Sequence, residues 1–139
     1  MKRFSIIVCC FLFLSFFISG GAQSASSTQV IVYYFHTTSR CPTCYKIEQY
    51  TQEAVEQYFN EEILAGTLIF KTINFDEKEN KHFIKDYQLY TKSVVISMIK
   101  EGKEVKFNNL TKIWEYVRDK EKFYEYIKIE TAKYLAGVK

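Results

Sequence analysis

Two kinds of hydrophobic pattern alternate along the chain after residue 28. Residues 29–36 (QVIVYYFH) form a nearly continuous run of β-branched and aromatic side chains, which predicts a strand buried on both faces. From Pro42 onward, apolar residues recur every three or four positions, which predicts an amphipathic helix that ends at Ala65-Gly66. By the same criteria we expect strands over 67–75, 93–99 and 104–107, and helices that open at 76–80, over 110–117 and after Asp119.

The later helices are expected to bury their apolar residues. In the helix that opens at 76–80, the residues expected to face inward are Phe83, Ile84, Tyr87 and Tyr90. In the last helix, the expected buried stripe consists of Phe123, Ile127, Thr131 and Tyr134. Asp119 is the expected N-cap of that helix, and Trp114 is expected in the core.

The order of these elements, β-α-β-α-β-β-α-α, places the chain in the α/β class. The first three strands are joined by helices, which predicts right-handed crossovers within one sheet. The short polar turn at 100–103 joins the last two strands as an antiparallel hairpin at the sheet edge. We therefore expect a three-layer α/β/α sandwich, with a mixed sheet of about four strands and a C-terminal hairpin followed by helices.

The first 22 residues have the order of a secretory signal peptide. Lys2 and Arg3 give a positively charged start, residues 6–18 are apolar and uncharged, and small residues follow at 19–22. We expect cleavage after Ala22. The alternative is an uncleaved membrane anchor, since the apolar stretch is just long enough to span a bilayer.

Both alternatives predict an exported protein, either periplasmic or extracellular. Contact with a membrane is expected only through this N-terminal segment, and only if it is not cleaved. Cleavage leaves 23–28 as a short polar linker and 29–139 as a single domain. It also lowers the net charge from +3 to +1, because Lys2 and Arg3 are lost. With charges so evenly balanced, a nucleic-acid binder that depends on positive charge is excluded.

The composition fits one folded domain without a nucleotide cofactor. The chain of 139 residues is 47% hydrophobic and 17% aromatic, which excludes a disordered chain. Neither of the usual glycine-rich phosphate-binding motifs occurs, and only five glycines are present. We therefore expect no cofactor.

Cys41-Pro42-Thr43-Cys44 is the candidate for chemistry. The other two cysteines lie in the predicted signal, so this pair is left alone in a compartment where disulfides persist. Cys41 lies where a buried strand gives way to a helix, and free N–H groups there favour the reactive thiolate. Pro42 suits the first helical position, and Cys44 can reach back from about one turn away. Arg40 adds a fixed positive charge beside the pair. This arrangement predicts thiol–disulfide exchange, and Pro42 and Thr43 are expected to bias its redox potential.

Two other interpretations of the cysteine pair stay open. A purely structural disulfide is disfavoured, because a two-residue gap closes almost no loop and gains little entropy. A soft-metal or metalloid site is the sharper alternative, with His36 joining Cys41 and Cys44 as a third ligand. However, no second pair of ligands is present, and His82 is expected on the surface of a helix.

The C-P-T-C motif at a strand–helix junction, the element order and the K-E-G-K hairpin together resemble the thioredoxin superfamily over about residues 28–136. The segment VYYFHTTSRCPTCYKIEQYT, with DEKENKHFIKDYQLYTKSVV downstream, also resembles a small exported thioredoxin-like group, the ArsF-type nitrophenyl-compound nitroreductase subunits. The superfamily resemblance implies a thioredoxin-like fold. It also implies disulfide exchange with Cys41 as the nucleophile and Cys44 as the resolving thiol.

Two positions depart from the superfamily. Many members have a buried acid six residues before the first cysteine, as a proton relay for the second thiol. Phe35 stands there in this chain, so the relay is either absent or replaced by His36 or a water molecule. Most members also have a cis-proline at the start of the strand that faces the motif, where this chain has Ser93. In the superfamily that proline shapes the substrate groove and helps to keep metals off the thiols, so its replacement favours the metal alternative.

Three functional hypotheses follow. The first is an extracytoplasmic thiol–disulfide oxidoreductase that acts on protein thiols or disulfides. The second is a thiol module that binds a soft metal or metalloid. The third is an accessory subunit that docks on a partner enzyme of the nitroreductase type. The placement of the motif and the lack of other cysteines favour the first.

Overall fold

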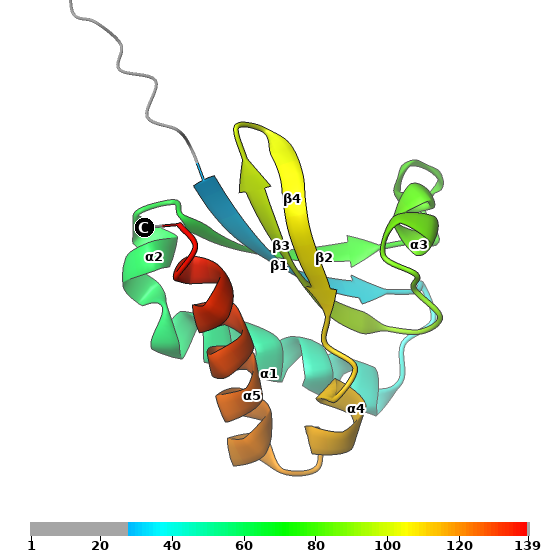
Figure 1. Cartoon of the computed structure of the whole chain (residues 1–139). Coiled ribbons are helices and arrows are strands. Elements are labelled where there is room, and N and C mark those ends of the chain that lie inside the picture. The colour runs from blue at the N-terminus through cyan, green and yellow to red at the C-terminus, as the bar shows by residue number, and fades with distance from the viewer. Residues whose placement is uncertain (1–27, 139) are drawn as a thin grey trace, which may run out of the picture.

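The computed structural model describes residues 28–138, which form a four-stranded sheet in the order β2-β1-β3-β4 (Figure 1). The strands are β1 (Thr28–His36), β2 (Leu68–Asn74), β3 (Ser93–Lys100) and β4 (Lys103–Asn109). β1 pairs parallel with β2 and antiparallel with β3, and β3 pairs antiparallel with β4. The sheet is therefore mixed, with β3 running opposite to the other three strands. The predicted signal at 1–22 and all but the last residue of the predicted linker lie outside the described residues.

Helices cover both faces of this sheet. They are α1 (Pro42–Tyr58), α2 (Asn60–Leu64), the short 3₁₀ helix η1 (Lys78–Asn80), α3 (His82–Asp86), α4 (Ile113–Tyr116) and α5 (Lys120–Leu135). α1 and α5 pack on one face, and α3 with its flanking segments packs on the other (Figure 1). The predicted fold class is thus confirmed: an α/β/α sandwich of the thioredoxin-like type with a C-terminal hairpin and helices.

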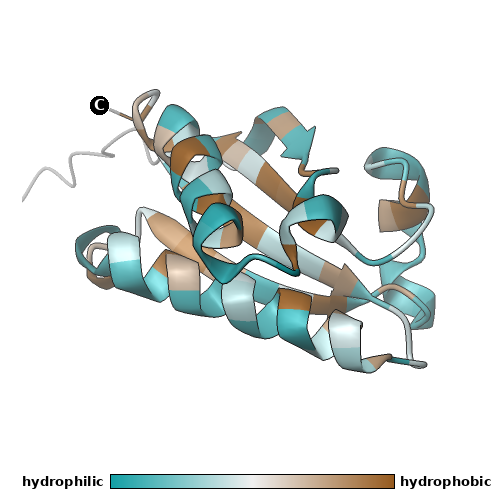
Figure 2. Ribbon diagram, turned by 90° about the horizontal axis from the view of Figure 1, so that it is seen from below, coloured by the Kyte–Doolittle hydropathy of each residue, from teal (hydrophilic) through white to brown (hydrophobic). Residues whose placement is uncertain are grey.

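Strict alternation along β1 creates the two cores. Val30, Val32 and Tyr34 are fully buried against α1 and α5. Ile31, Tyr33 and Phe35 point to the opposite face. Both sets are aliphatic or aromatic, because a central strand is covered on both faces. Figure 2 shows hydrophobic segments along the sheet and on the helices that cover it. The continuous apolar run at 29–36 therefore predicted the environment of β1 correctly, although the strand begins one residue earlier, at Thr28.

The expectation that crossovers join all of the first three strands was wrong for β3. His36 at the end of β1 pairs with Asn74 at the end of β2, while Ser93 at the start of β3 pairs with Phe35. The connection from β2 to β3 therefore leaves the sheet at the carboxyl end of β2 and returns at that same end of the strands. A strand that starts there must run antiparallel to β1 and β2, so only the β1–β2 link is a parallel crossover.

The long helix predicted from Pro42 is divided at Phe59. This residue leaves helical geometry, with φ −135° and ψ 32°, and its side chain is buried in the core beside α1. α2 then continues for five residues and ends before Gly66, whose φ of +72° suits glycine. The division lets the chain turn toward β2 without exposing the phenyl ring.

Three residues expected in the interior are exposed. The exposed fractions are 40% for Ile84, 93% for Tyr90 and 37% for Trp114. α3 and α4 have only five and four residues, so each buries little more than one turn, and a helical stripe does not extend past their ends. The stripe of α5 is confirmed, since all four of its predicted residues are buried and the Asp119 side chain accepts from the Lys122 N–H. Between residues 28 and 138, no helix is long and apolar enough to cross a membrane.

Candidate functional site

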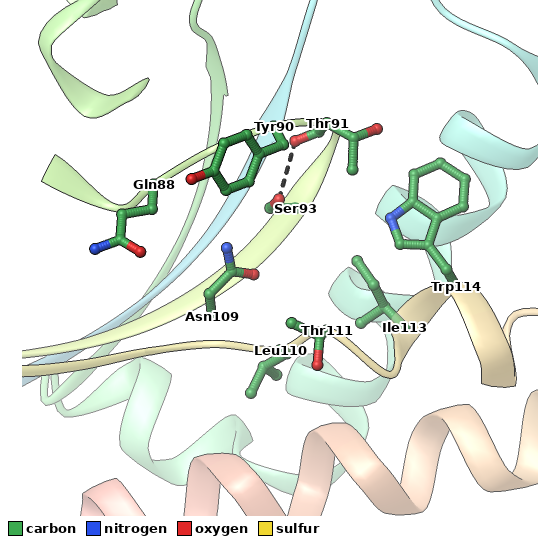
Figure 3. Close-up of a pocket in the computed structure, with 9 residues that line it drawn as sticks. All are labelled: Gln88, Tyr90, Thr91, Ser93, Asn109, Leu110, Thr111, Ile113 and Trp114. Atoms are coloured by element: carbon green, nitrogen blue, oxygen red, sulfur yellow. Dashed lines mark hydrogen bonds between the residues drawn. The ribbon is translucent and has the colours of Figure 1, made fainter. Parts of the chain in front are cut away.

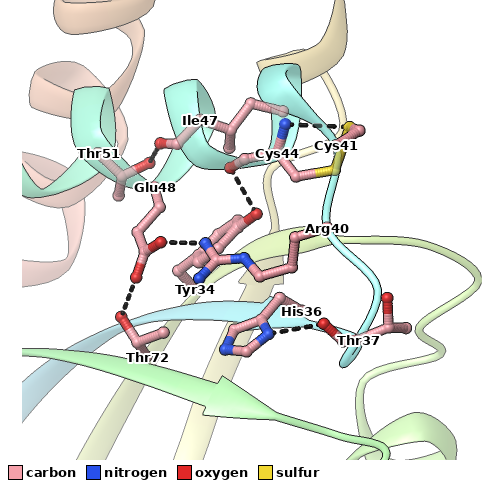
Figure 4. Close-up of polar contacts among 10 residues, drawn as sticks. All are labelled: Tyr34, His36, Thr37, Arg40, Cys41, Cys44, Ile47, Glu48, Thr51 and Thr72. Carbon is pink, nitrogen blue, oxygen red and sulfur yellow. Dashed lines mark hydrogen bonds and ion pairs between the residues drawn. A yellow bond between two sulfur atoms is a disulfide. The ribbon is translucent and has the colours of Figure 1, made fainter.

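Cys41 and Cys44 form a disulfide where the loop after β1 enters α1 (Figure 4). Their Cα atoms are 5.0 Å apart. Pro42 occupies the first helical position, as predicted, where its missing N–H costs no hydrogen bond. The carbonyl of Cys41 accepts from the N–H groups of Cys44 and Tyr45 at 2.9 and 3.2 Å, which closes the first turn.

The two cysteines differ in accessibility and in their hydrogen bonds. Cys41 is exposed and is the N-cap of α1, with its Sγ accepting from the Cys44 N–H at 3.1 Å. Cys44 is only 1% exposed. An exposed sulfur that already accepts from a helix N-terminus is suited to be the attacking thiolate, because the same N–H stabilises the anion. The buried sulfur, one turn further, is suited to resolve.

Tyr34 lies on the core side of Cys44 and forms a hydrogen bond with it. Its hydroxyl donates to the Cys44 carbonyl at 2.7 Å, and its ring is fully buried in the core under α1 (Figure 4). Burial is the main cause that raises the pKa of Tyr34 to about 12, so the hydroxyl remains a donor at ordinary pH. Phe35, which occupies the position of the superfamily's acid, points to the opposite face of the sheet. The residue under the motif is therefore its neighbour Tyr34, which the sequence analysis missed.

Arg40 lies beside the pair, but its charge is already compensated. Its guanidinium donates to Glu48, whose other carboxylate oxygen accepts from the Thr72 hydroxyl at 3.1 Å (Figure 4). The guanidinium carbon also lies 4.2 Å from the centre of the Tyr45 ring. Partial burial opposes the charged form of Arg40, yet the hydrogen bond and charge of Glu48 outweigh it and raise the pKa of the guanidinium. The positive charge expected at Arg40 is therefore paired with Glu48, and this ion pair links the loop after β1 to α1.

Glu48 is a second residue that sequence reasoning missed. It follows Cys44 by four residues, so both lie on one side of α1, and that spacing was a usable signal. The Nε atom of Arg40 is buried and finds no hydrogen-bond partner within the part of the chain that the structure describes. Arg40 therefore links the loop to α1 through its contact with Glu48 and its packing against Tyr45.

His36 lies at the end of β1, stacked on Tyr34 with ring centres 5.9 Å apart. Its Nδ1 is 2.9 Å from the Thr37 carbonyl oxygen. Among residues 28–138, no three His, Cys, Asp or Glu side chains form a group that could hold a metal ion. The alternative set of Cys41, Cys44 and His36 is therefore not assembled in this structure.

Ser93 and Thr43 line two hollows that meet at Trp114. Ser93 is buried at the start of β3, its hydroxyl donates to the Thr91 carbonyl at 2.9 Å, and it lines a hollow of about 190 Å³ (Figure 3). Thr43 lines a neighbouring hollow of about 270 Å³. Trp114 lines both, and its Nε1 donates to the Lys92 carbonyl at 3.1 Å. That hydrogen bond holds the indole ring at the surface, where 37% of Trp114 is exposed.

Among comparisons with known proteins, only those with solved structures give matches to this chain. No family model matches the sequence, and no curated protein matches it. Similar solved structures include the oxidised thioredoxin of Plasmodium falciparum, 16% identical with a TM-score of 0.41, over 71% of this chain and 85% of that one. Oxidised thioredoxin O2 of Arabidopsis thaliana is 15% identical, with a TM-score of 0.39, over 69% and 76%. Fasciola hepatica thioredoxin is 22% identical, with a TM-score of 0.37, over 65% and 79%.

The fold assignment rests on the strand order and directions of this chain. The ArsF-type resemblance has no match in these comparisons and stays a prediction.

Proposed function

We propose that this protein is a thiol–disulfide oxidoreductase that works outside the cytoplasm on the thiols or disulfides of other proteins. The observation that carries the proposal is the contrast within one motif. Cys41 is exposed and its Sγ accepts an N–H at the start of α1, while its disulfide partner Cys44 is buried. A disulfide with a two-residue gap adds little stability, so its placement at a reactive position favours redox chemistry.

The exchange is a two-electron reaction in two displacements. In the reducing direction, the Cys41 thiolate attacks one sulfur of a partner disulfide, and that S–S bond breaks as a mixed disulfide forms. The freed partner thiolate takes a proton. Cys44, as a thiolate, then attacks the Cys41 sulfur, which closes the Cys41–Cys44 disulfide and releases the second partner thiol. The oxidising direction is the same sequence in reverse.

The test is a redox titration of residues 23–139. The protein is equilibrated in graded dithiol buffers, free thiols are trapped by alkylation, and the two cysteines are counted by mass. We expect one reversible two-electron transition. A midpoint near about −270 mV indicates a reductant and one near about −120 mV an oxidant. Thiols that stay reduced over this whole range would contradict a working redox couple.

Single-cysteine variants assign the two roles. Cys41→Ser removes the nucleophile and should abolish exchange with partner disulfides. Cys44→Ser should still form the mixed disulfide but fail to release it, so a covalent complex accumulates. If Cys41→Ser exchanges as fast as the unaltered protein, the assignment of Cys41 is wrong.

The trapped complex also tests the identity of the partner. The ArsF-type resemblance proposes a partner enzyme of the nitroreductase type, and mass spectrometry of the complex formed by Cys44→Ser identifies what is bound. The proposed location rests on the charged start, apolar run and small residues of 1–22. Fractionation of the producing cell and the N-terminal mass of the mature protein test it, with a chain beginning at Gln23 as the expected result.

A further inference from the structure

A continuous surface leads away from the disulfide toward the loop before β3. It begins at the hollow beside Thr43 and passes over Trp114, which lines both hollows. It continues into the hollow beside Ser93, whose lining Figure 3 shows. The Trp114 ring is held by its hydrogen bond to the Lys92 carbonyl, so α4 is tied to that loop. The surface is therefore formed by three segments distant in the sequence, the start of α1, the 88–93 loop and α4.

The two hollows differ in chemistry. The one beside Ser93 is bordered mainly by apolar or uncharged groups, including Tyr90, Leu110, Ile113 and Trp114. Its volume of about 190 Å³ suits one apolar side chain, since a cavity of about 150 Å³ accepts benzene. Tyr90 is 93% exposed at its rim, so its ring is free to pack against a bound segment.

The hollow beside Thr43 carries positive charge. Lys46 and Arg118 both line it, both are exposed, and neither forms an ion pair with any residue of the described range 28–138. No carboxylate is among the residues that line either hollow. This differs from the other side of the motif, where Glu48 compensates Arg40. Two free cations facing one hollow next to the exposed cysteine favour an anionic occupant.

We propose that this surface selects partner segments that carry an acidic residue near the reactive cysteine. The partner carboxylate lies between Lys46 and Arg118, and an apolar side chain of the same segment fills the hollow under Tyr90 and Trp114. This inference rests on the proposed function and adds the chemistry of the partner. Selection of this kind acts mainly on the rate of encounter and is weakened by salt.

The test uses two peptides that each carry one cysteine as a mixed disulfide with 2-mercaptoethanol. They differ only in an Asp or an Asn beside that cysteine. The rate of their reduction is measured with the reduced protein and with the double variant Lys46→Gln/Arg118→Gln. At low salt, we expect the variant to lose about three- to tenfold of the rate with the Asp peptide and to keep its rate with the Asn peptide.

The matched control is Lys78→Gln/Lys85→Gln, which removes the same charge from exposed lysines of the η1–α3 region on the other face of the sheet. It should leave both rates unchanged. Equal loss with both peptides would mean that Lys46 and Arg118 act on the thiol itself and would overturn the inference, as would no loss at all. The small uncharged pair of bis(2-hydroxyethyl) disulfide and 2-mercaptoethanol separates the two proposals. A protein that neither reduces the disulfide nor, once oxidised, oxidises the thiol fails the proposed function, whereas a protein that exchanges with this pair but does not discriminate between the peptides fails only the inference.

Discussion

The two faces of the sheet are built differently, and only one of them supports the site. Under α1 and α5 lies a large aliphatic and aromatic core that includes Ile47, Phe123 and Ile127, all fully buried. The other face is covered by the short α3 and by a smaller, mostly aromatic cluster around Phe35 and Tyr87. The cysteine motif lies at the start of α1, so its geometry is fixed by the larger core.

The difference shows how the cysteine motif is held in place. The first turn of α1 is bonded from beneath by Tyr34, a residue of the larger core, and from the side by the Arg40–Glu48 pair. The smaller face has its own polar anchor, in which the hydroxyls of Tyr87 and Ser97 both donate to Glu104. That anchor ties β3 and β4 to the segment after α3, without contact to the motif. Stability of the smaller face and reactivity of the motif should therefore be separable.

Matched truncations of one phenylalanine on each face should give the largest effect. Phe123 is fully buried in the larger core, so Phe123→Ala should lower the free energy of unfolding by about 3–5 kcal/mol. Phe83 packs only at the edge of the smaller cluster, and Phe83→Ala should cost clearly less, because part of its ring is already in water. Urea unfolding of both variants measures the difference. Equal losses would show that the two faces contribute alike.

The polar anchor of the smaller face should give the next largest effect. Ser97 is fully buried, and its hydroxyl donates to the Glu104 carboxylate at 2.6 Å. Ser97→Ala should cost about 1.5 kcal/mol, at the low end for a hydrogen bond to a charged group, because Glu104 reaches solvent. The alkylation rate of the reduced cysteines should not change. A changed rate would show that the two faces are coupled.

Tyr34→Phe is the counterpart under the motif. It removes the hydroxyl that donates to the Cys44 carbonyl and should cost about 0.5–1.5 kcal/mol. Because the first turn of α1 loses a support, reduced Cys44 should be alkylated faster than in the unaltered protein, as measured by mass spectrometry. Tyr33→Phe is the control, since the Tyr33 ring lies on the other face. If it accelerates alkylation equally, the effect does not pass through the Cys44 carbonyl.

The parts of the fold that depend on local pattern could be predicted from the sequence. The run at 29–36, the N-cap at Asp119 and the position of Cys41 before Pro42 each follow from rules that act within a few residues. The direction of β3 could not be predicted from local pattern, because it depends on the end of the sheet to which the 75–92 connection returns. The exposure of Trp114 depends on a carbonyl of another loop.

The same limit applies to the site. The cysteine pair and its placement were predictable, since a motif and a strand–helix boundary are local features. That Arg40 is neutralised by Glu48, and that Tyr34 rather than Phe35 lies beneath Cys44, depend on the folding of the 37–41 loop against α1. The alternation of β1 already assigned Tyr34 and Phe35 to opposite faces, but not which face α1 would cover.

The smallest expected effect concerns the contact between α1 and α5 on the larger face. Glu53 of α1 accepts from the Tyr124 hydroxyl and forms an ion pair with Lys120 at 2.9 Å. The hydrogen bond from Tyr124 has the largest effect on this carboxyl and that from Lys120 the next largest, and they lower the pKa of Glu53 to about 2. A carboxyl whose pKa is lower in the folded state than in the unfolded chain stabilises the fold above its unfolded pKa. This contribution is therefore complete at neutral pH and is lost as pH falls from about 4.5 toward about 2.

Glu53→Gln should flatten the fall in unfolding free energy across this interval, measured by urea unfolding at several pH values. The change should be modest because the side chain is partly in solvent. Glu61→Gln, at an exposed acid of α2 without an ion pair to a described residue, should keep the pH profile of the unaltered protein. An identical profile for Glu53→Gln would mean that packing alone holds α1 to α5.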